Sequence, residues 1–163
     1  SKNDNGKIKL VLSEICLDDF IKDVVEEVTC STKYSHHICV STNRLGVLMT
    51  DEKLLRNIVI NLLNNAIKFS PGKEEISLNI LDHGEVVTIE VRDDGIGIPP
   101  DEVEIIFEPF VRGKAAGVIQ GTGLGLSIVK KAVELLNGNI HVESFPGNGS
   151  VFKVTIPRQG CLI

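Results

Sequence analysis

The chain has 163 residues, of which 42% are hydrophobic and 24% charged, and its formal net charge is −5. This length and composition suit one globular core, so we interpret residues 1–163 as a single domain. An acidic balance with no basic stripe argues against nucleic-acid binding, and the lack of a long apolar run argues against membrane contact by this segment. The four cysteines lack CxxC spacing, which favours reduced thiols and a cytoplasmic location.

Hydrophobic and polar periodicity predicts the elements in chain order. The first half contains three strands and two helices: a strand near 7–12, a helix over about 18–32, strands around 38–41 and 46–50, and a helix over 51–69. The second half contains two hairpins and two helices: a hairpin turning at 82–84, a short helix near 101–107, a helix over 122–136, and a hairpin turning at 146–149. This order indicates the α+β class, with strands and helices in separate layers.

The predicted helix over 51–69 has two unequal faces. Asp51 is a candidate N-cap, and apolar residues recur along one side. The opposite side carries four asparagines and a lysine: Asn57, Asn61, Asn64, Asn65 and Lys68. Asparagine is a mediocre helix former, and its side-chain amide can offer an oxygen to Mg²⁺ and N–H donors to phosphate. The alternative is a solvated face that happens to be rich in asparagine.

The strand predicted over 85–93 alternates apolar and polar residues, and this alternation places Asp93 on the apolar face. An inward carboxylate is costly without a partner, and an N–H donor on a ligand would serve. The tight turn that follows, through Gly95, Gly97 and Ile98, is a place where a flat ring can approach the backbone. The alternative is that Asp93 caps the turn.

A glycine loop, Gly121-Thr122-Gly123-Leu124-Gly125-Leu126, leads directly into the last predicted helix. Glycines let backbone N–H groups approach an anion, and the first turn of a helix adds further unpaired N–H groups, as in a phosphate cradle. Two standard phosphate motifs do not fit. A dinucleotide fingerprint would need glycine at Leu126 or Ile128, and the Gly-Lys pairs of a possible P-loop are followed by Glu74 and Ala115. An ordinary turn is the alternative.

Together these segments resemble the catalytic, ATP-binding domain of sensor histidine kinases, in the superfamily that includes DNA gyrase, a heat-shock chaperone and mismatch-repair ATPases. Four motifs occur in the order of that family. The stretch 61–69 looks like its N box, 93–98 like its G1 box, Phe107-Glu108-Pro109-Phe110 like its F box, and 121–126 like its G2 box. The resemblance extends from about residue 7 to 157 and includes a glycine-rich turn before the last strand.

The resemblance implies a Bergerat-type ATP-binding fold, a two-layer α/β sandwich whose mixed sheet is covered on one face by three main helices. It implies ATP and Mg²⁺ as ligands and a flexible ATP lid at about 111–120. It assigns Mg²⁺ binding to Asn65 and Asn61, and catalytic positioning to Asn61, Lys68 and Arg112. The implied nucleotide contacts are Asn61, Asn65, Lys68, Asp93, Gly95, Gly97, Ile98, Phe110, Arg112, Gly121, Thr122, Gly123, Leu124, Gly125 and Leu126.

The implied function is transfer of the γ-phosphoryl group of Mg-ATP to a histidine on a separate dimerisation domain of the same parent protein, which then signals to a response regulator in a two-component system. In ATP-hydrolysing relatives a glutamate one turn before the magnesium-binding asparagine activates water, whereas this chain has Asn61, which disfavours efficient hydrolysis. None of the four histidines lies in the acceptor motif, so we expect the helical acceptor domain outside this chain and the isolated domain to be monomeric. The alternatives are an ATP-hydrolysing or serine-kinase member of the superfamily and a degenerate, non-catalytic module.

Overall fold

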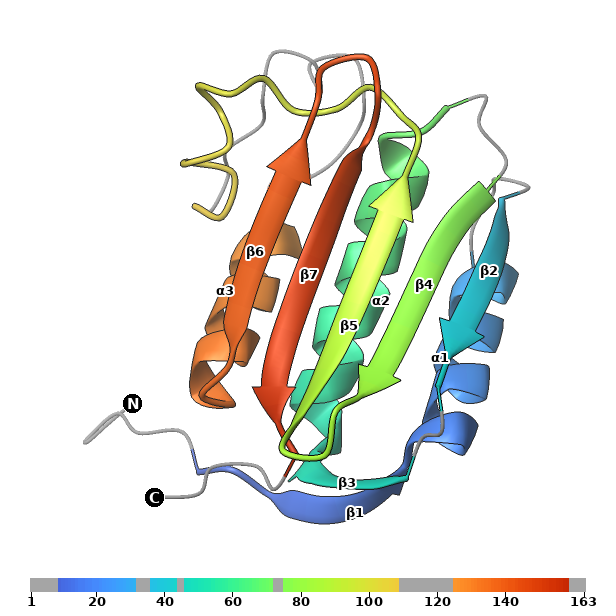
Figure 1. The fold of residues 1–163 in the computed structure, drawn as a ribbon, viewed down its shortest axis with the longest axis vertical. Coiled ribbons are helices and arrows are strands. Elements are labelled where there is room, and N and C mark those ends of the chain that lie inside the picture. The colour runs from blue at the N-terminus through green and yellow to red at the C-terminus, as the bar shows by residue number, and fades with distance from the viewer. Residues whose placement is uncertain (1–8, 32–35, 44–45, 72–74, 109–124, 159–163) are drawn as a thin grey trace.

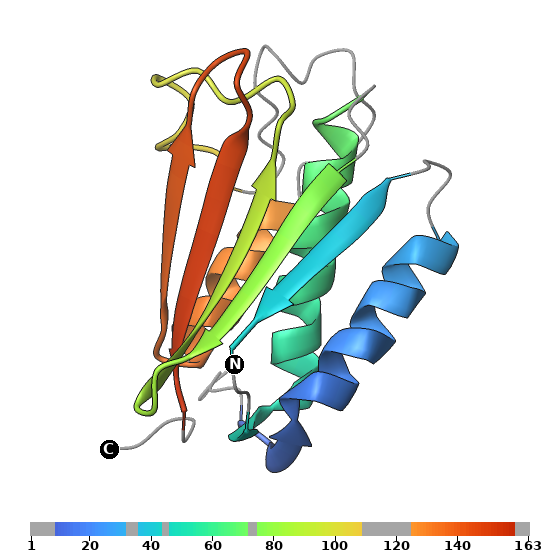
Figure 2. The same cartoon turned by 45° about the vertical axis from the view of Figure 1, so that its right-hand side comes forward.

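The structure is a computed structural model of the chain and describes residues 9–31, 36–43, 46–71, 75–108 and 125–158. These residues form two layers, a five-stranded sheet and three helices that lie on one face of it (Figures 1 and 2). The predicted α+β class and two-layer sandwich are therefore confirmed. Within the described ranges, no helix is both long enough and apolar enough to cross a membrane.

The main sheet is mixed. Its strands, in spatial order, are β2 (His37–Thr42), β4 (Glu75–Asp82), β5 (Val86–Asp93), β7 (Ser150–Pro157) and β6 (Asn139–Ser144). β2 runs parallel to β4, and the other neighbouring pairs are antiparallel. A separate antiparallel pair, β1 (Leu12–Cys16) with β3 (Val47–Asp51), lies at the lower end of Figure 1. Because β5 has a neighbour on each side, its last residues are enclosed by the sheet.

The helices are α1 (Leu17–Ser31), α2 (Glu52–Lys68) and α3 (Gly125–Leu135), and α2 contacts both of the others. The predicted cap of α2 is confirmed, because Asp51 Oδ1 accepts a hydrogen bond from the Leu54 N–H at 3.2 Å. The apolar side of α2 is buried, and it consists of Leu55, Ile58, Val59, Leu62, Leu63, Ala66 and Ile67. The asparagine side is therefore left half-buried at the border of the helical layer.

The core lies between the helices and the central strands. The inward residues of β5 and β7 are at most 1% exposed: Val87, Ile89, Val91, Phe152, Val154 and Ile156. Full burial of one such side chain contributes about 1.5–3 kcal/mol to stability. Packing of these strand residues against the apolar side of α2 therefore fixes α2 against β5. The C-terminal ends of α2 and β5 consequently meet at the upper end of the molecule in Figure 1.

Two sequence-based predictions are wrong in detail. The strand predicted near 7–12 is observed at Leu12–Cys16, because this segment pairs with β3 in a register that places Leu12 opposite Asp51. The short helix predicted near 101–107 is a series of turns, in which the N–H groups of Glu102, Ile105 and Glu108 each bond to a carbonyl three residues earlier. The last helix, predicted from 122, is described from Gly125, and 122–124 lie outside the described ranges.

Candidate functional site

Asp93 ends strand β5 with a buried carboxylate. Side chains alternate along a strand, so Asp93 lies on the same face as Ile89 and Val91, and it is only 2% exposed. One carboxylate oxygen accepts a hydrogen bond from the Gly95 N–H at 2.9 Å, and the other accepts one from the Ser150 hydroxyl at 2.9 Å. The predicted inward carboxylate is confirmed, and Asp93 also caps the turn, which was the alternative interpretation.

The environment of Asp93 raises the pKa of its carboxyl group above the ordinary value. Burial is the largest cause, because it removes water from the charged form, and the charge of Asp94 acts in the same direction. Hydrogen bonds from the Gly95 backbone and from the hydroxyl and backbone of Ser150 oppose part of the rise. A carboxylate has about four acceptor positions, so the bonds from Gly95 and the Ser150 hydroxyl leave acceptor capacity for a donor on a ligand.

The turn after Asp93 is held between α2 and the β6–β7 hairpin. The Ile96 N–H donates to the Phe69 carbonyl at 2.9 Å, and the Ile96 carbonyl accepts from the Gly147 N–H at 2.8 Å. A Cβ on Gly95 would lie 1.8 Å from the Phe69 oxygen, and one on Gly97, which has a φ of +73°, would lie 2.4 Å from the Phe145 oxygen. The two glycines therefore let protein backbone pack against the turn at these points. The approach of a flat ring to this turn stays a prediction.

The end of the turn is also fixed by a side chain. The Ile98 N–H donates to the Ser144 hydroxyl oxygen at 2.6 Å, and that hydroxyl donates to the Gly149 carbonyl at 3.2 Å. Gly149 has a φ of +84°, and a Cβ there would lie 2.0 Å from the Asp93 oxygen of the backbone. The backbone around Asp93 is thus enclosed by the hairpin, and the Ile98 side chain packs against the core.

The asparagine face of α2 meets the start of α3. Asn61 and Asn65 are half-buried and Lys68 is exposed. The Asn61 side-chain amide donates to the Asn57 carbonyl at 2.7 Å, and its Oδ1 lies 3.4 Å from the position that a Cβ would take on Gly125. The structure therefore brings Asn61 next to the end of the predicted glycine loop, where the N-terminus of α3 presents a partial positive charge.

Six of the predicted site residues lie outside the described ranges: Phe110, Arg112, Gly121, Thr122, Gly123 and Leu124. The predicted lid at 111–120 lies outside them as well. Of the glycine loop, the described part is Gly125, which begins α3, and Leu126, which packs against the core while half-buried. The described predicted residues are grouped on α2, on the end of β5 with its turn, and at the start of α3.

Sequence reasoning missed two serines that support this site. Ser150 is 5% exposed and bonds to the Asp93 carboxylate, and Ser144 holds the Ile98 N–H. A signal for Ser150 was present, because the alternation along β7 places it on the same face as the buried Phe152 and Val154. A serine on an apolar strand face indicates a polar partner, just as Asp93 does.

The donor set fits a purine nucleotide with a divalent cation. The buried Asp93 carboxylate can accept a hydrogen bond from a ring amino group, and the amides of Asn61 and Asn65 carry oxygens of the kind that Mg²⁺ prefers. Lys68 and the N-terminus of α3 carry positive charge of the kind that phosphates would need. Across the described segments there is no cluster of three His, Cys, Asp or Glu side chains suited to a metal, so a cation here would depend on amides and phosphates.

The family is shown by comparison with known proteins. A profile described as histidine kinase-, DNA gyrase B- and HSP90-like ATPase matches residues 50–160. The chain is 43% identical over 119 residues to the circadian input-output histidine kinase CikA of Synechococcus elongatus, covering 72% of the chain and 16% of CikA. It is 34% identical over 160 residues to the adaptive-response sensory kinase SasA of Crocosphaera subtropica, covering 96% of the chain and 42% of SasA. The chain thus spans less than half the length of these relatives.

Solved structures agree with this assignment. The mycobacterial sensor histidine kinase MprB matches with a TM-score of 0.77 and 25% identity, covering 93% of this chain and 100% of that one. Full-length ShkA in complex with AMPPNP matches with a TM-score of 0.80 and 27% identity, covering 96% of this chain and 32% of that one. The chain belongs to the family of histidine kinase-, DNA gyrase B- and HSP90-like ATPases, and within it to the ATP-binding catalytic domains of histidine kinases.

Proposed function

We propose that this domain binds Mg-ATP and transfers the γ-phosphoryl group to a histidine on a separate dimerisation domain of its parent protein, from which a response regulator receives the signal. The observation that carries the proposal is the buried Asp93 carboxylate, set at the head of a turn that is fixed on both sides and next to the asparagine face of α2. In this proposal the base binds at Asp93, and the phosphates bind beside it at the asparagine face of α2. This segment is expected to lie in the cytoplasm, whether or not its parent protein is anchored in a membrane.

Each side chain has a role in this proposal. Asp93 accepts a hydrogen bond from the adenine amino group, and the Ile98 segment borders the base. Asn65, together with Asn61, holds the magnesium ion, which neutralises phosphate charge when bound. Lys68, Arg112 and the backbone amides of 121–126 position the phosphates. Phosphoryl transfer needs little covalent chemistry from a protein, so positioning and charge stabilisation account for most of the catalysis.

The residue at position 61 supports a kinase over a hydrolase. A carboxylate at this place would be able to take a proton from water, but the amide of Asn61 has no basic oxygen of that strength. Its N–H group is engaged with the Asn57 carbonyl, and its oxygen faces the start of α3. We expect slow ATP hydrolysis by the domain alone.

The four histidines of the chain support an acceptor elsewhere. His37 and His141 lie in strands β2 and β6, His83 lies in the β4–β5 turn, and His36 directly precedes β2. A phosphoacceptor of this kinase class lies on a helical hairpin, and the described helices α1, α2 and α3 contain no histidine. The acceptor domain is therefore a partner of this domain, and the isolated domain is expected to be a monomer.

The test is in two stages. Calorimetric titration with a non-hydrolysable ATP analogue, with and without Mg²⁺, should show magnesium-dependent binding that is weakened in Asp93→Asn. Radiolabelled ATP and the acceptor hairpin of a related kinase should then give an acid-labile, base-stable phosphohistidine. Failure of the unmodified chain to bind the analogue would favour a degenerate module, and rapid phosphate release without an acceptor would favour a hydrolase.

A further inference from the structure

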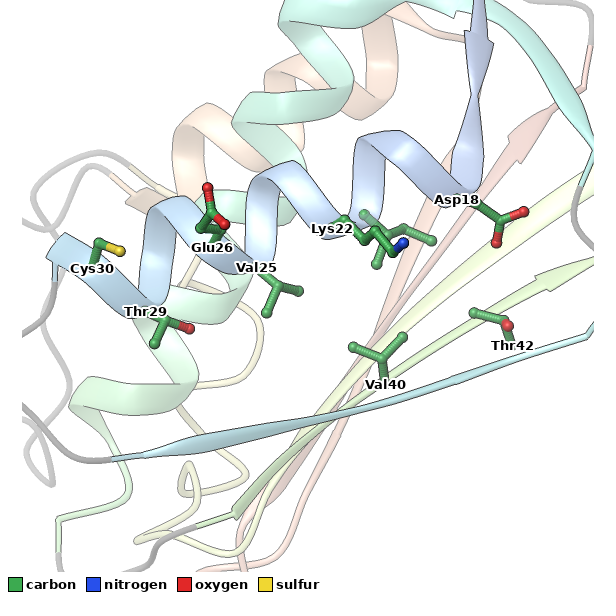
Figure 3. Close-up of a pocket in the computed structure, with 9 residues that line it drawn as sticks. Asp18, Lys22, Val25, Glu26, Thr29, Cys30, Val40 and Thr42 are labelled. Carbon is green, nitrogen blue, oxygen red and sulfur yellow. The ribbon is translucent and has the colours of Figure 1, made fainter.

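A groove lies between α1 and the edge strand β2, two strands away from β5 (Figure 3). Its volume is about 490 Å³. Val25 and Thr29 of α1 point toward β2, and Val40 of β2 points toward α1. Val40 is 43% exposed although it shares a strand face with the buried Ile38. The groove is therefore an apolar hollow that opens to solvent along the border of the sheet.

The groove runs beside a strand edge that the described residues leave unpaired. β2 is the first strand in the order of the five-stranded sheet and pairs with β4 on one side. Backbone groups alternate along a strand, so N–H and C=O groups of β2 also point outward. Natural edge strands are usually protected by charges, proline or a bulge, but His37–Thr42 contains no Asp, Glu, Lys, Arg or Pro. The opposite edge strand, β6, carries Glu143.

An unprotected edge beside an apolar groove suits an extended peptide. The peptide backbone pairs with β2, and every second side chain enters the groove, because side chains alternate along a strand. Main-chain hydrogen bonds then supply affinity, and the groove between Val25 and Val40 selects aliphatic side chains at alternate positions. A helix or a small molecule would leave the outward N–H and C=O groups of β2 unused.

The charge of α1 indicates the partner's composition. The helix carries five carboxylates and one lysine, and two of the carboxylates, on Asp23 and Glu27, pair with Arg56. The three others, on Asp18, Asp19 and Glu26, are exposed, and two of them, Asp18 and Glu26, line the groove together with Lys22. Pairing of two copies of this chain through β2 would bring two acidic helices together, which is unfavourable, whereas a basic segment is attracted.

We propose that the groove between α1 and β2 is a docking site for an extended, basic segment of a separate protein, which adds to the sheet as a strand beside β2. The segment carries aliphatic side chains at alternate positions and lysine or arginine between them. The groove lies two strands from β5, and none of its lining residues belongs to the ATP site described above.

The probe is a fluorescein-labelled peptide of alternating valine and lysine, titrated with the full chain and followed by anisotropy. We expect saturable binding that weakens about tenfold or more in Val40→Lys, because the lysine enters the groove and adds a charge to the edge. Thr42→Lys, at an exposed position of the same strand, is the second variant. Val47→Lys is the matched control, since Val47 is 50% exposed on β3 and outside the groove.

Two further peptides identify the mode of binding. N-methylation of alternate amides of the peptide should abolish binding, because it removes the backbone donors. Replacement of its lysines by glutamate should weaken binding, and the difference in affinity between the two peptides should become smaller at high salt. The proposal is overturned if the unmodified chain does not bind the peptide, if both β2 variants bind it unchanged, or if the N-methylated peptide binds equally well. Self-association that both variants abolish would instead identify a second copy as the occupant and also overturn it.

Discussion

At the scale of single residues, the buried Asp93 carboxylate links pH to stability and to nucleotide affinity in opposite directions. Its pKa is raised in the folded chain, so between the ordinary and the raised pKa the folded state holds more protons than the unfolded state. The Asp93 contribution to stability is therefore largest below that window and is lost as the pH rises through it. Acceptance of a hydrogen bond from adenine favours the ionised form, so affinity should fall as the pH is lowered through the same window.

Calorimetry over a pH series with the ATP analogue measures this effect. We expect Asp93→Asn to bind about 10- to 100-fold more weakly at neutral pH, as for the loss of a hydrogen bond to a charged group. Asp93→Asn should also lose the part of the pH dependence that Asp93 causes. Protonation of the adenine ring affects the unmodified chain and the variant equally, so it cancels when the two are compared. Asp94→Asn is the control: Asp94 is exposed beside the same turn, so this variant should keep the affinity at neutral pH, and because the Asp94 charge raises the pKa of Asp93, its pH dependence should move to lower pH without disappearing. An identical pH profile in Asp93→Asn would refute the adenine role.

The magnesium dependence of binding tests the role of Asn65. Asn65→Ala removes an amide oxygen from the half-buried face of α2 and should abolish most of the increase in affinity that Mg²⁺ produces. Binding without Mg²⁺ should change by less than about threefold, since alanine preserves the helix. Asn64→Ala, at the neighbouring half-buried position, should keep the full magnesium effect. If Asn65→Ala still responds to Mg²⁺ as the unmodified chain does, another residue is the ligand.

At the scale of elements, the turn after β5 depends on close backbone contact. In Gly97→Ala the new methyl group meets the Phe145 carbonyl, and the backbone also keeps a φ of +73° that alanine disfavours. We expect a loss of about 1–3 kcal/mol in the free energy of unfolding, measured with urea, and weaker binding of the ATP analogue. Gly84→Ala is matched, because its φ is +93° and nothing lies within 4 Å of the added methyl group. Equal nucleotide affinity in the two variants would contradict this account.

The elements that could be predicted are those whose signal is local. The alternation along β5 predicted the inward Asp93, and the capping residue Asp51 predicted the start of α2. The order of strands could not be predicted, because β2 pairs with β4 across a whole helix and β5 pairs with β7 across α3. The misplacement of β1 has the same cause, since its bounds are set by pairing with β3. Local patterns also missed Ser150, whose role depends on a residue 57 positions away.

At the scale of the whole molecule, the two ends of the sandwich differ in purpose. The upper end in Figure 1 carries the turn after Asp93, which is bonded to the end of α2. At the lower end, the Arg158 N–H bonds to Glu85, its carbonyl accepts from Met49, and its guanidinium pairs with Asp82. Asp82 is 7% exposed in this pair. Arg158 therefore connects the end of β7, the β4–β5 hairpin and the two-stranded sheet of β1 and β3, far from the candidate nucleotide site.

This separation predicts that stability and binding can be changed independently. The hydrogen bond from Arg158 lowers the pKa of Asp82, so the pair stabilises the fold above the ordinary pKa, and this contribution is lost as the pH falls through the lowered value. Arg158→Ala should reduce the free energy of unfolding at neutral pH by about 1–2 kcal/mol and should flatten its decline in acid. Affinity for the ATP analogue should stay within about twofold. Arg92→Ala, which removes an exposed arginine from β5, should change neither quantity. If Arg158→Ala loses affinity for the ATP analogue together with stability, the two-stranded sheet of β1 and β3 and the nucleotide site are coupled through the core.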